Sequence, residues 1–195
     1  FGLGSANGSR TGASPLAEMM ENLTKKPNIS VITCMGNEAN NKCHYKGTVM
    51  SALVPDVMEI NVDGTGKGFT MEIWADSLDI LSVSIESPSG EYVPRIPARM
   101  GASMEYTFLY EGSTVTVDYQ ITENVAGMEV RFVRLKTPVE GTWKFYIYSL
   151  TNIKGSYNAW LPLKQFSGQD IYFLKSDPDT TLTVPAAADG VISVG

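Results

Sequence analysis

The feature that most constrains the fold is a series of short runs in which apolar and polar residues alternate. About eight such runs follow one another from Gly47 to Leu163: TVMSALV, FTMEIWA, ILSVSIES, MEYTFLY, STVTVDYQI, MEVRFVRL, TWKFYIYSL and SYNAWLPL. Turn signals such as Asp63-Gly64 and Glu140-Gly141 separate them. A period of two residues is typical of strands with one buried face. The pattern predicts an antiparallel β-sandwich of the jelly-roll type, with no helix among its strands.

The segments on either side of this region have a different pattern. Ser14 is a good N-cap, Pro15 suits the first helical position, and the apolar residues that follow recur at helical spacing until Pro27. The short apolar run Val31–Cys34 is typical of a strand buried on both faces, as in a parallel sheet. A second run of this kind is Val191–Val194. Helix and buried strands together indicate an α/β segment.

Taken in order, these patterns predict a mostly β protein in which an antiparallel jelly-roll-like β-sandwich is inserted into a partial α/β segment. We expect residues 1–46 to form the first α/β part, 47–175 the inserted sandwich, and 176–195 the return to the α/β part. Loops tolerate such insertions because they lie on the surface. The insertion requires that the strands Val31–Cys34 and Val191–Val194 come together in space.

Composition and charge exclude several classes of partner. The net charge is −6, so the chain lacks the basic surface that nucleic acids or anionic membranes attract. No apolar run reaches the roughly 18 residues that a membrane-spanning helix needs. We therefore expect no nucleic-acid partner and no membrane span.

The sequence also predicts no metal site and no cofactor. Cys34, Cys43 and His44 are three candidate ligands without a fourth, at a spacing that zinc sites do not use. We expect Cys34 to be a buried strand thiol and His44, the only histidine, to lie in a solvent-exposed loop. The sequence does not decide whether Cys34 and Cys43 form a disulfide.

Three stretches, in this order, resemble the subtilisin-like serine proteases (subtilases). Gly2-Leu3-Gly4-Ser5 is similar to the segment that forms one wall of the primary specificity pocket. Residues Val31–Glu38 are similar to the strand that ends in Ala-Ala-Gly-Asn-Glu, and Pro185–Gly195 to the loop and strand that end in Val-Gly-Ala. The central region resembles the jelly-roll insertion of one branch of this family, which includes germination proteases of anaerobic spore-forming bacteria.

This resemblance implies roles for individual residues. Asn37 would be the catalytic oxyanion-hole donor, and the substrate-binding residues would be Leu3, Gly4, Ser5, Met35 and Gly36. From its residue type alone, Asn37 is a turn residue that tolerates left-handed backbone, and the glycine-rich start is a frayed end. Cys34 and Met35 stand where the family mostly has two alanines, which changes the expected shape of the specificity pocket.

The resemblance further implies that the catalytic triad is not in this chain. The catalytic Asp and His would precede Phe1 and the nucleophilic Ser would follow Gly195; the chain has neither His-Gly-Thr nor Gly-Thr-Ser. We therefore expect an internal fragment of a serine endopeptidase, inactive alone, extracellular or spore-associated, with a structural jelly-roll insertion. Its partners would be the remainder of the protease body, the propeptide and a peptide or protein substrate.

Two other functions compete with this interpretation. The sandwich could be a binding module for carbohydrate or protein, with Trp74, Trp143 and Trp160 as a stacking surface for sugars. Alternatively, the chain belongs to a catalytically dead subtilase, a pseudoprotease, since the residues that decide between an active and a dead enzyme lie outside it.

Overall fold

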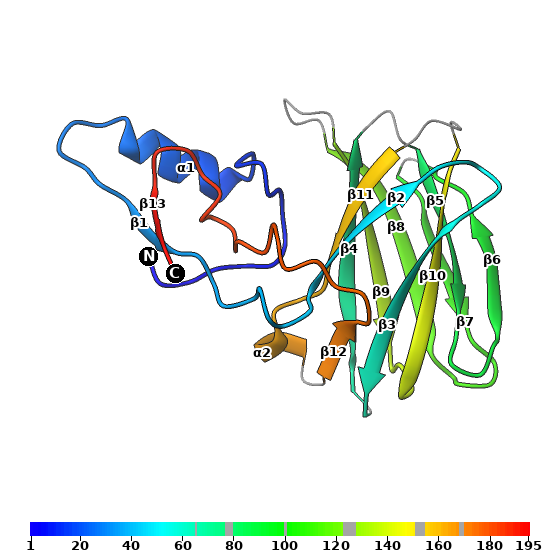
Figure 1. The fold of residues 1–195 in the computed structure, drawn as a ribbon. Coiled ribbons are helices and arrows are strands. Elements are labelled where there is room, and N and C mark those ends of the chain that lie inside the picture. Colours follow the sequence, from blue (N-terminus) through cyan, green and yellow to red (C-terminus); the bar gives the residue numbers. More distant parts are fainter. Residues whose placement is uncertain (65, 77–79, 100, 123–127, 151–154, 168–169) are drawn as a thin grey trace. The chain divides into compact units, whose positions relative to one another are not determined.

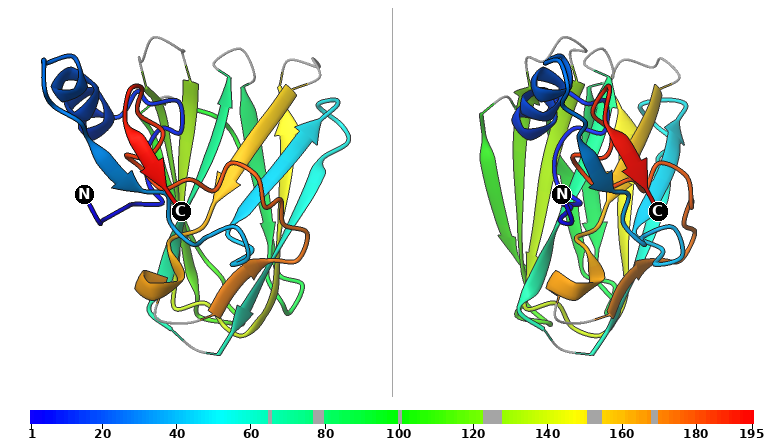
Figure 2. Two further views of the ribbon diagram at one scale, coloured as in Figure 1. Left: turned by 60° about the vertical axis from the view of Figure 1, so that its left-hand side comes forward. Right: turned by 90° about the vertical axis from the view of Figure 1, so that its left-hand side faces the viewer.

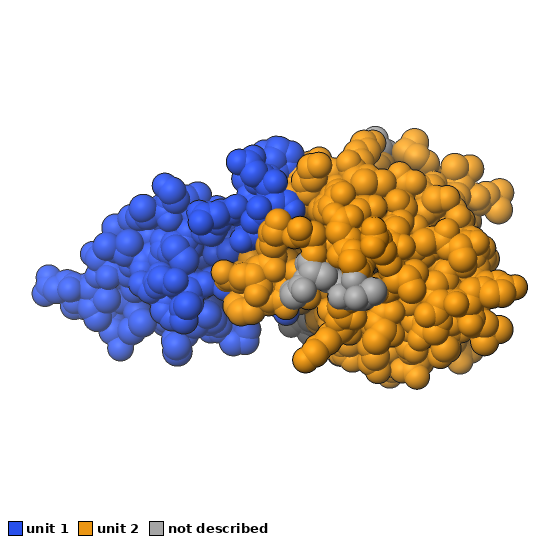
Figure 3. Space-filling model, turned by 90° about the horizontal axis from the view of Figure 1, so that it is seen from below, with its two compact units in different colours: residues 1–41, 178–195 blue, residues 42–177 orange. Residues whose placement is uncertain are grey.

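The computed structural model describes residues 1–64, 66–76, 80–99, 101–122, 128–150, 155–167 and 170–195. The chain forms two compact units, coloured separately in Figure 3. The first unit consists of Phe1–Asn41 and Pro178–Gly195, and the second of Lys42–Asp177. The second unit is continuous in sequence and interrupts the first, which is therefore built from two separate segments.

Within the described residues, the second unit has two antiparallel sheets stacked face to face (Figures 1 and 2). A six-stranded sheet has the order β2 (His44–Val49), β11 (Gly155–Trp160), β4 (Gly68–Asp76), β9 (Met128–Lys136), β8 (Thr114–Thr122), β7 (Ser103–Thr107). A five-stranded sheet has the order β12 (Asp170–Phe173), β3 (Asp56–Asp63), β10 (Gly141–Ser149), β5 (Leu81–Glu86), β6 (Tyr92–Ile96). The predicted mostly β, antiparallel sandwich is thus confirmed.

The core of this unit lies between the two sheets. Along β3 and β10 alternate residues point inward, as the period of two predicts: Met58 and Ile60 on β3, and Trp143 and Phe145 on β10, are all fully buried. Tyr157 on β11 faces them from the other sheet and is also fully buried. The burial of such side chains stabilises the sandwich by about 25 cal/mol for each Å² of apolar surface removed from water.

The strands differ from the predicted ones in several places. Strand β2 begins earlier than predicted, at His44, and ends at Val49, so only the first two residues of the run TVMSALV are strand. Leu53 and Val54 at the end of that run are exposed. Strands β3, β6 and β12 were not predicted. β6 and β12 are edge strands, and β6 contains Pro94, which fits an edge because it cannot donate a ladder hydrogen bond. A four-residue helix, α2 (Lys164–Ser167), interrupts the strands that were expected to have no helix among them.

The first unit contains the predicted helix and a two-stranded parallel sheet. Helix α1 (Pro15–Thr24) begins as expected, since the Ser14 side chain accepts a hydrogen bond from the Ala17 N–H at 3.2 Å. Strands β1 (Ile32–Cys34) and β13 (Ile192–Val194) pair in parallel, with Ile32 opposite Ile192 (Figure 2). The prediction that these two strands come together across the inserted sandwich is confirmed.

The parallel pair is not buried on both faces, and that part of the prediction was wrong. Ile32, Ile192 and Val194 are 54%, 53% and 56% exposed, whereas Thr33 is buried. Cys34 is only half-buried, so it is not the buried thiol expected. Exposure alternates along β1 because, among the described residues, one face of this small sheet is covered and the other is open.

Candidate functional site

The residues that follow β1 form a sharp turn at Gly36. Gly36 has φ 87°, and a Cβ there would lie 2.5 Å from the Thr183 Cγ2, so only glycine fits. Asn37 comes next and is exposed. The φ angle of Asn37 is not positive. Asn37 therefore does not have the left-handed backbone that would explain an asparagine in an ordinary turn.

The side-chain amide of Asn37 is available for an external partner. None of the described residues hydrogen-bonds to it, and only the Asn37 carbonyl is used, by the Asn41 side chain at 3.4 Å. Asn41 also donates to the Glu38 carboxylate at 3.0 Å, and its own N–H donates to the Glu38 carbonyl at 3.0 Å. Asn41 thus holds the loop after Asn37 in place without engaging the Asn37 amide.

Three of the predicted site residues line one open hollow. It has a volume of about 450 Å³ and is lined by Met35, Gly36, Asn37, Ala39, Asn40, Thr181, Leu182 and Gly195. The hollow therefore combines the turn after β1 with residues just after the sandwich and at the end of β13. Leu3, Gly4 and Ser5 do not line it.

Leu3–Ser5 lie beside Thr183 and Val184, in the segment that follows the sandwich. The Ser5 N–H donates to the Val184 carbonyl and the Val184 N–H donates to the Ser5 carbonyl, both at 2.9 Å. Upstream, the Cys34 N–H donates to the Phe1 carbonyl at 3.2 Å, so the chain from Phe1 runs beside β1. This glycine-rich start is held at both ends and is not a frayed terminus. Leu3 is 72% exposed between these two anchors.

Sequence reasoning missed Thr183, which joins these segments. It is buried, its N–H donates to the Met35 carbonyl at 3.0 Å, and its hydroxyl donates to the Cys34 carbonyl at 3.4 Å. Its side chain also contacts Gly4 and Gly36. No local signal identifies Thr183, because all of these partners are far away in the sequence.

His44 is not in a solvent-exposed loop, and that prediction was wrong. It is fully buried at the start of β2, where its Nε2 lies 3.0 Å from the Asn158 Oδ1 and its Nδ1 lies 3.2 Å from the Asp177 carbonyl. The ring stacks on Trp160 at 4.9 Å between centroids. Its partners are an amide and a carbonyl, so His44 has a structural environment rather than that of a catalytic base.

The other candidates for chemistry are also accounted for. Cys34 and Cys43 are free thiols, so the disulfide left open by the sequence is not formed. Within the described part of the chain, no group of three His, Cys, Asp or Glu side chains could hold a metal ion. Trp74, Trp143 and Trp160 are all buried, at 5%, 0% and 5% exposure, so they do not form a stacking surface for sugars.

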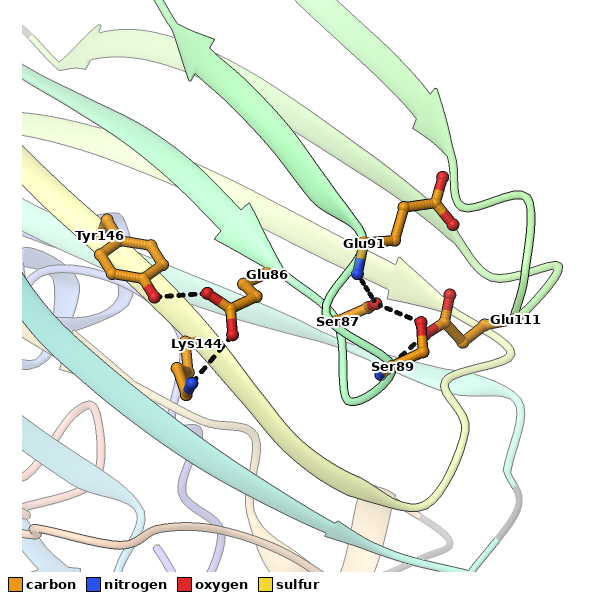
Figure 4. Close-up of polar contacts among 7 residues, drawn as sticks. All are labelled: Glu86, Ser87, Ser89, Glu91, Glu111, Lys144 and Tyr146. Carbon is orange, nitrogen blue, oxygen red and sulfur yellow. Dashed lines mark hydrogen bonds and ion pairs between the residues drawn. The ribbon is translucent and has the colours of Figure 1, made fainter.

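Carboxylates of the sandwich accept hydrogen bonds from its strands and turns (Figure 4). Glu86 accepts hydrogen bonds from Lys144 at 2.8 Å and from the Tyr146 hydroxyl at 2.5 Å. The hydrogen bond from Lys144, with that from Tyr146, lowers the pKa of Glu86, and the same contact with Glu86 raises the pKa of Tyr146 to about 12. In the neighbouring turn, the Ser89 N–H donates to Glu111 at 3.1 Å. These carboxylates hold strands and turns together.

The chain belongs to the class of α/β proteins in which a β-sandwich is inserted between two parallel strands. No family model matches the chain, and no curated protein matches it. Among solved structures it is similar to the CspB protease of Clostridium perfringens, with a TM-score of 0.87 and 24% sequence identity. The match covers 100% of this chain and 40% of that chain. The chain therefore has the fold of a part of a protease and spans less than half of that protein's length.

Among the described residues, no helix is long and apolar enough to cross a membrane.

Proposed function

We propose that the chain is the central part of a subtilisin-like serine endopeptidase, with Asn37 as the oxyanion-hole donor and the sandwich as a structural insertion. The observation that carries this proposal is the parallel pairing of β1 with β13, which joins two stretches that resemble subtilases. The exposed and unengaged amide of Asn37 lies just beyond β1. The fold shared with the CspB protease supports the same function.

The open face of the small parallel sheet supports a larger α/β body. Parallel sheets are normally covered on both faces, whereas Ile32, Ile192 and Val194 are each more than half exposed. The rest of the protease body is the natural cover for this apolar surface. In the proposal, that body also supplies the nucleophilic Ser, the His general base and the Asp that orients it.

The geometry fits the chemistry of acyl transfer. Attack on the scissile carbonyl places negative charge on its oxygen, and a fixed N–H aimed at that charge lowers the barrier. The Asn37 side chain provides such a donor on a turn that Gly36 and Asn41 hold in place. The backbone groups of Leu3 and Gly4 have no hydrogen-bond partner among the described residues, so they are available to an extended peptide.

The test is Asn37→Ala in the full-length protein that contains this chain. We expect kcat for a peptide substrate to fall by about 10²–10³, the range known for loss of one oxyanion-hole donor in an enzyme of this type, with little change in KM. Asn22→Ala, an exposed asparagine on α1, is the matched control and should leave kcat unchanged. An Asn37→Ala enzyme with undiminished kcat would exclude the oxyanion role.

A pseudoprotease would share all of this geometry, so a second measurement separates it from an active enzyme. A fluorophosphonate probe reacts covalently with an activated serine and not with a dead site. Labelling of the full-length protein supports the endopeptidase, and its absence with correctly folded protein supports the pseudoprotease. The binding-module alternative has no support from the tryptophans, which are buried, and predicts retention on a glycan array.

A further inference from the structure

Three tyrosines lie together on the outer face of the five-stranded sheet. Along β10, Tyr146 and Tyr148 alternate with the buried Phe145 and Ile147, so they point away from the core. Tyr92 on β6 approaches them from across β5, and the rings of Tyr92 and Tyr146 lie 5.9 Å apart, edge to face. Burial and a hydrogen bond with Tyr92 raise the pKa of Tyr148. The three side chains therefore form one group, the tyrosine cluster.

Short side chains on β5 allow the tyrosine cluster to form. Ser82 and Ser84 face the same side of the sheet, opposite Tyr148 and Tyr146. They are 1% and 0% exposed although they lie on the outer face, so larger side chains extend over them. Arg95 is one of these, since its Nε donates to the Ser82 hydroxyl and its guanidinium lies 4.5 Å from the centre of the Tyr148 ring. The three tyrosines do not belong to the core between the sheets, so burial in that core does not account for them.

The charged side chains around the tyrosine cluster are engaged within the same face. Lys144 donates to Glu86 at 2.8 Å, as Figure 4 shows, and Arg95 also donates to the Ala52 carbonyl at 3.1 Å. Tyr92 is 48% exposed and the other two tyrosines are half-buried, so a ligand can reach all three. The cluster therefore offers rings and hydroxyl groups rather than an unpaired charge.

We propose that the tyrosine cluster is a binding site for a neutral polysaccharide. A sugar ring has C–H groups on its faces, which pack on aromatic rings, and hydroxyls around its rim, which exchange hydrogen bonds with tyrosine hydroxyls that both donate and accept. An extended peptide fits less well, because β10 and β5 are each paired on both sides and have no free main-chain groups for it. Nucleic acids and acidic polysaccharides need unpaired cations, and the chain has a net charge of −6.

The experiment titrates the full-length protein with neutral hexasaccharides of glucose, N-acetylglucosamine, mannose and galactose, and measures Kd by calorimetry. We expect at least one to bind. Tyr92→Ala should weaken that binding about tenfold or more, the effect of removing a central aromatic contact, and Tyr92→Phe, which keeps the ring, should weaken it less. Phe166→Ala, an exposed aromatic residue on α2, is the matched control and should leave Kd unchanged.

Several results would overturn the saccharide site. One is that no hexasaccharide binds while Tyr92→Ala lowers the Tm of the full-length protein, because the cluster then packs against another part of that protein. Others are binding of an oligogalacturonate alone, and a Kd that Tyr92→Ala does not change. If Tyr92→Ala does not fold, the ring NMR signals of the three tyrosines in the wild-type protein should still shift on addition of the hexasaccharide, and unshifted signals exclude the site.

The saccharide site stands apart from the proposed endopeptidase function. A protein that the fluorophosphonate probe does not label can still bind the hexasaccharide, and a labelled protein can fail to bind it. The two proposals are therefore tested separately.

Discussion

The carboxylate of Asp56 connects β3 to two strands of the opposite sheet, β2 and β11, through two buried tyrosines. Its Oδ2 accepts hydrogen bonds from the Tyr157 hydroxyl at 2.8 Å and from the Tyr45 hydroxyl at 3.0 Å. Burial and the nearby charge of Asp56 raise the pKa of Tyr157 far above its ordinary value, so its hydroxyl stays protonated and donates. Gly47 makes room for this cluster, since a Cβ there would lie 2.3 Å from the Tyr157 ring.

Asp56→Ala should therefore destabilise the sandwich. Tyr157 is fully buried, and loss of its charged acceptor leaves its hydroxyl only the neutral hydroxyl of Tyr45, at a cost of about 1–3 kcal/mol. Tyr45 keeps a weak acceptor, the Val57 carbonyl at 3.5 Å, so its loss is smaller. We expect a total of about 2–4 kcal/mol, which lowers Tm by roughly 4–16 °C for a chain of this length.

The assay is urea unfolding of the protein followed by tryptophan fluorescence, which reports on the sandwich because all three tryptophans lie in it. Tyr157→Phe should cost about 1.5–3 kcal/mol in the wild-type protein, where the hydroxyl meets a charged acceptor. In the Asp56→Ala background it should cost clearly less, because the charged acceptor is already gone and only the neutral hydroxyl of Tyr45 remains. Asp189→Ala, an exposed position, is the control. Equal costs of Tyr157→Phe in both backgrounds would refute the coupling.

Three further predictions concern the sandwich. Hydrogen bonds from Lys144 and Tyr146 lower the pKa of Glu86, so the ionised carboxylate stabilises the fold above the ordinary pKa of 4.5, and this stabilisation is lost as pH falls through the lowered pKa. Glu86→Gln should therefore reduce the free energy of unfolding near neutral pH and reduce it less in acid. Denaturation at several pH values measures this difference. Tyr146, observed by NMR, should titrate near pH 12 in the wild-type protein and nearer 10 in Glu86→Gln, and an unchanged titration would contradict the contact. In the endopeptidase that we propose, replacing residues 42–177 by a short linker should lower the Tm and speed loss of the propeptide, and no change in either would exclude a stabilising role for the sandwich.

The proposed site was only partly predictable from the sequence. Met35, Gly36 and Asn37 were found through the resemblance to subtilases, and in the structure all three line one hollow. Leu3–Ser5 were also found by resemblance, but they pair with Val184 and do not line this hollow. Thr183 was missed, since it contacts Gly4 and Gly36 from a segment that follows the whole sandwich, and nothing in its own neighbourhood distinguishes it from an ordinary loop threonine.

The sequence by itself determined the features that depend on neighbours along the chain. The cap of α1 by Ser14 and the inward alternation of Trp143 and Phe145 follow from local hydrogen bonding and from the two-residue period of a strand. Only the tertiary structure decided which groups are covered. His44 is buried where its ring contacts Asn158 and Asp177, both more than a hundred residues away in the sequence. The hydroxyl of Thr183 donates to the carbonyl of Cys34, at a separation of 149 residues. Such contacts depend on how the sheets close, which no window of sequence contains.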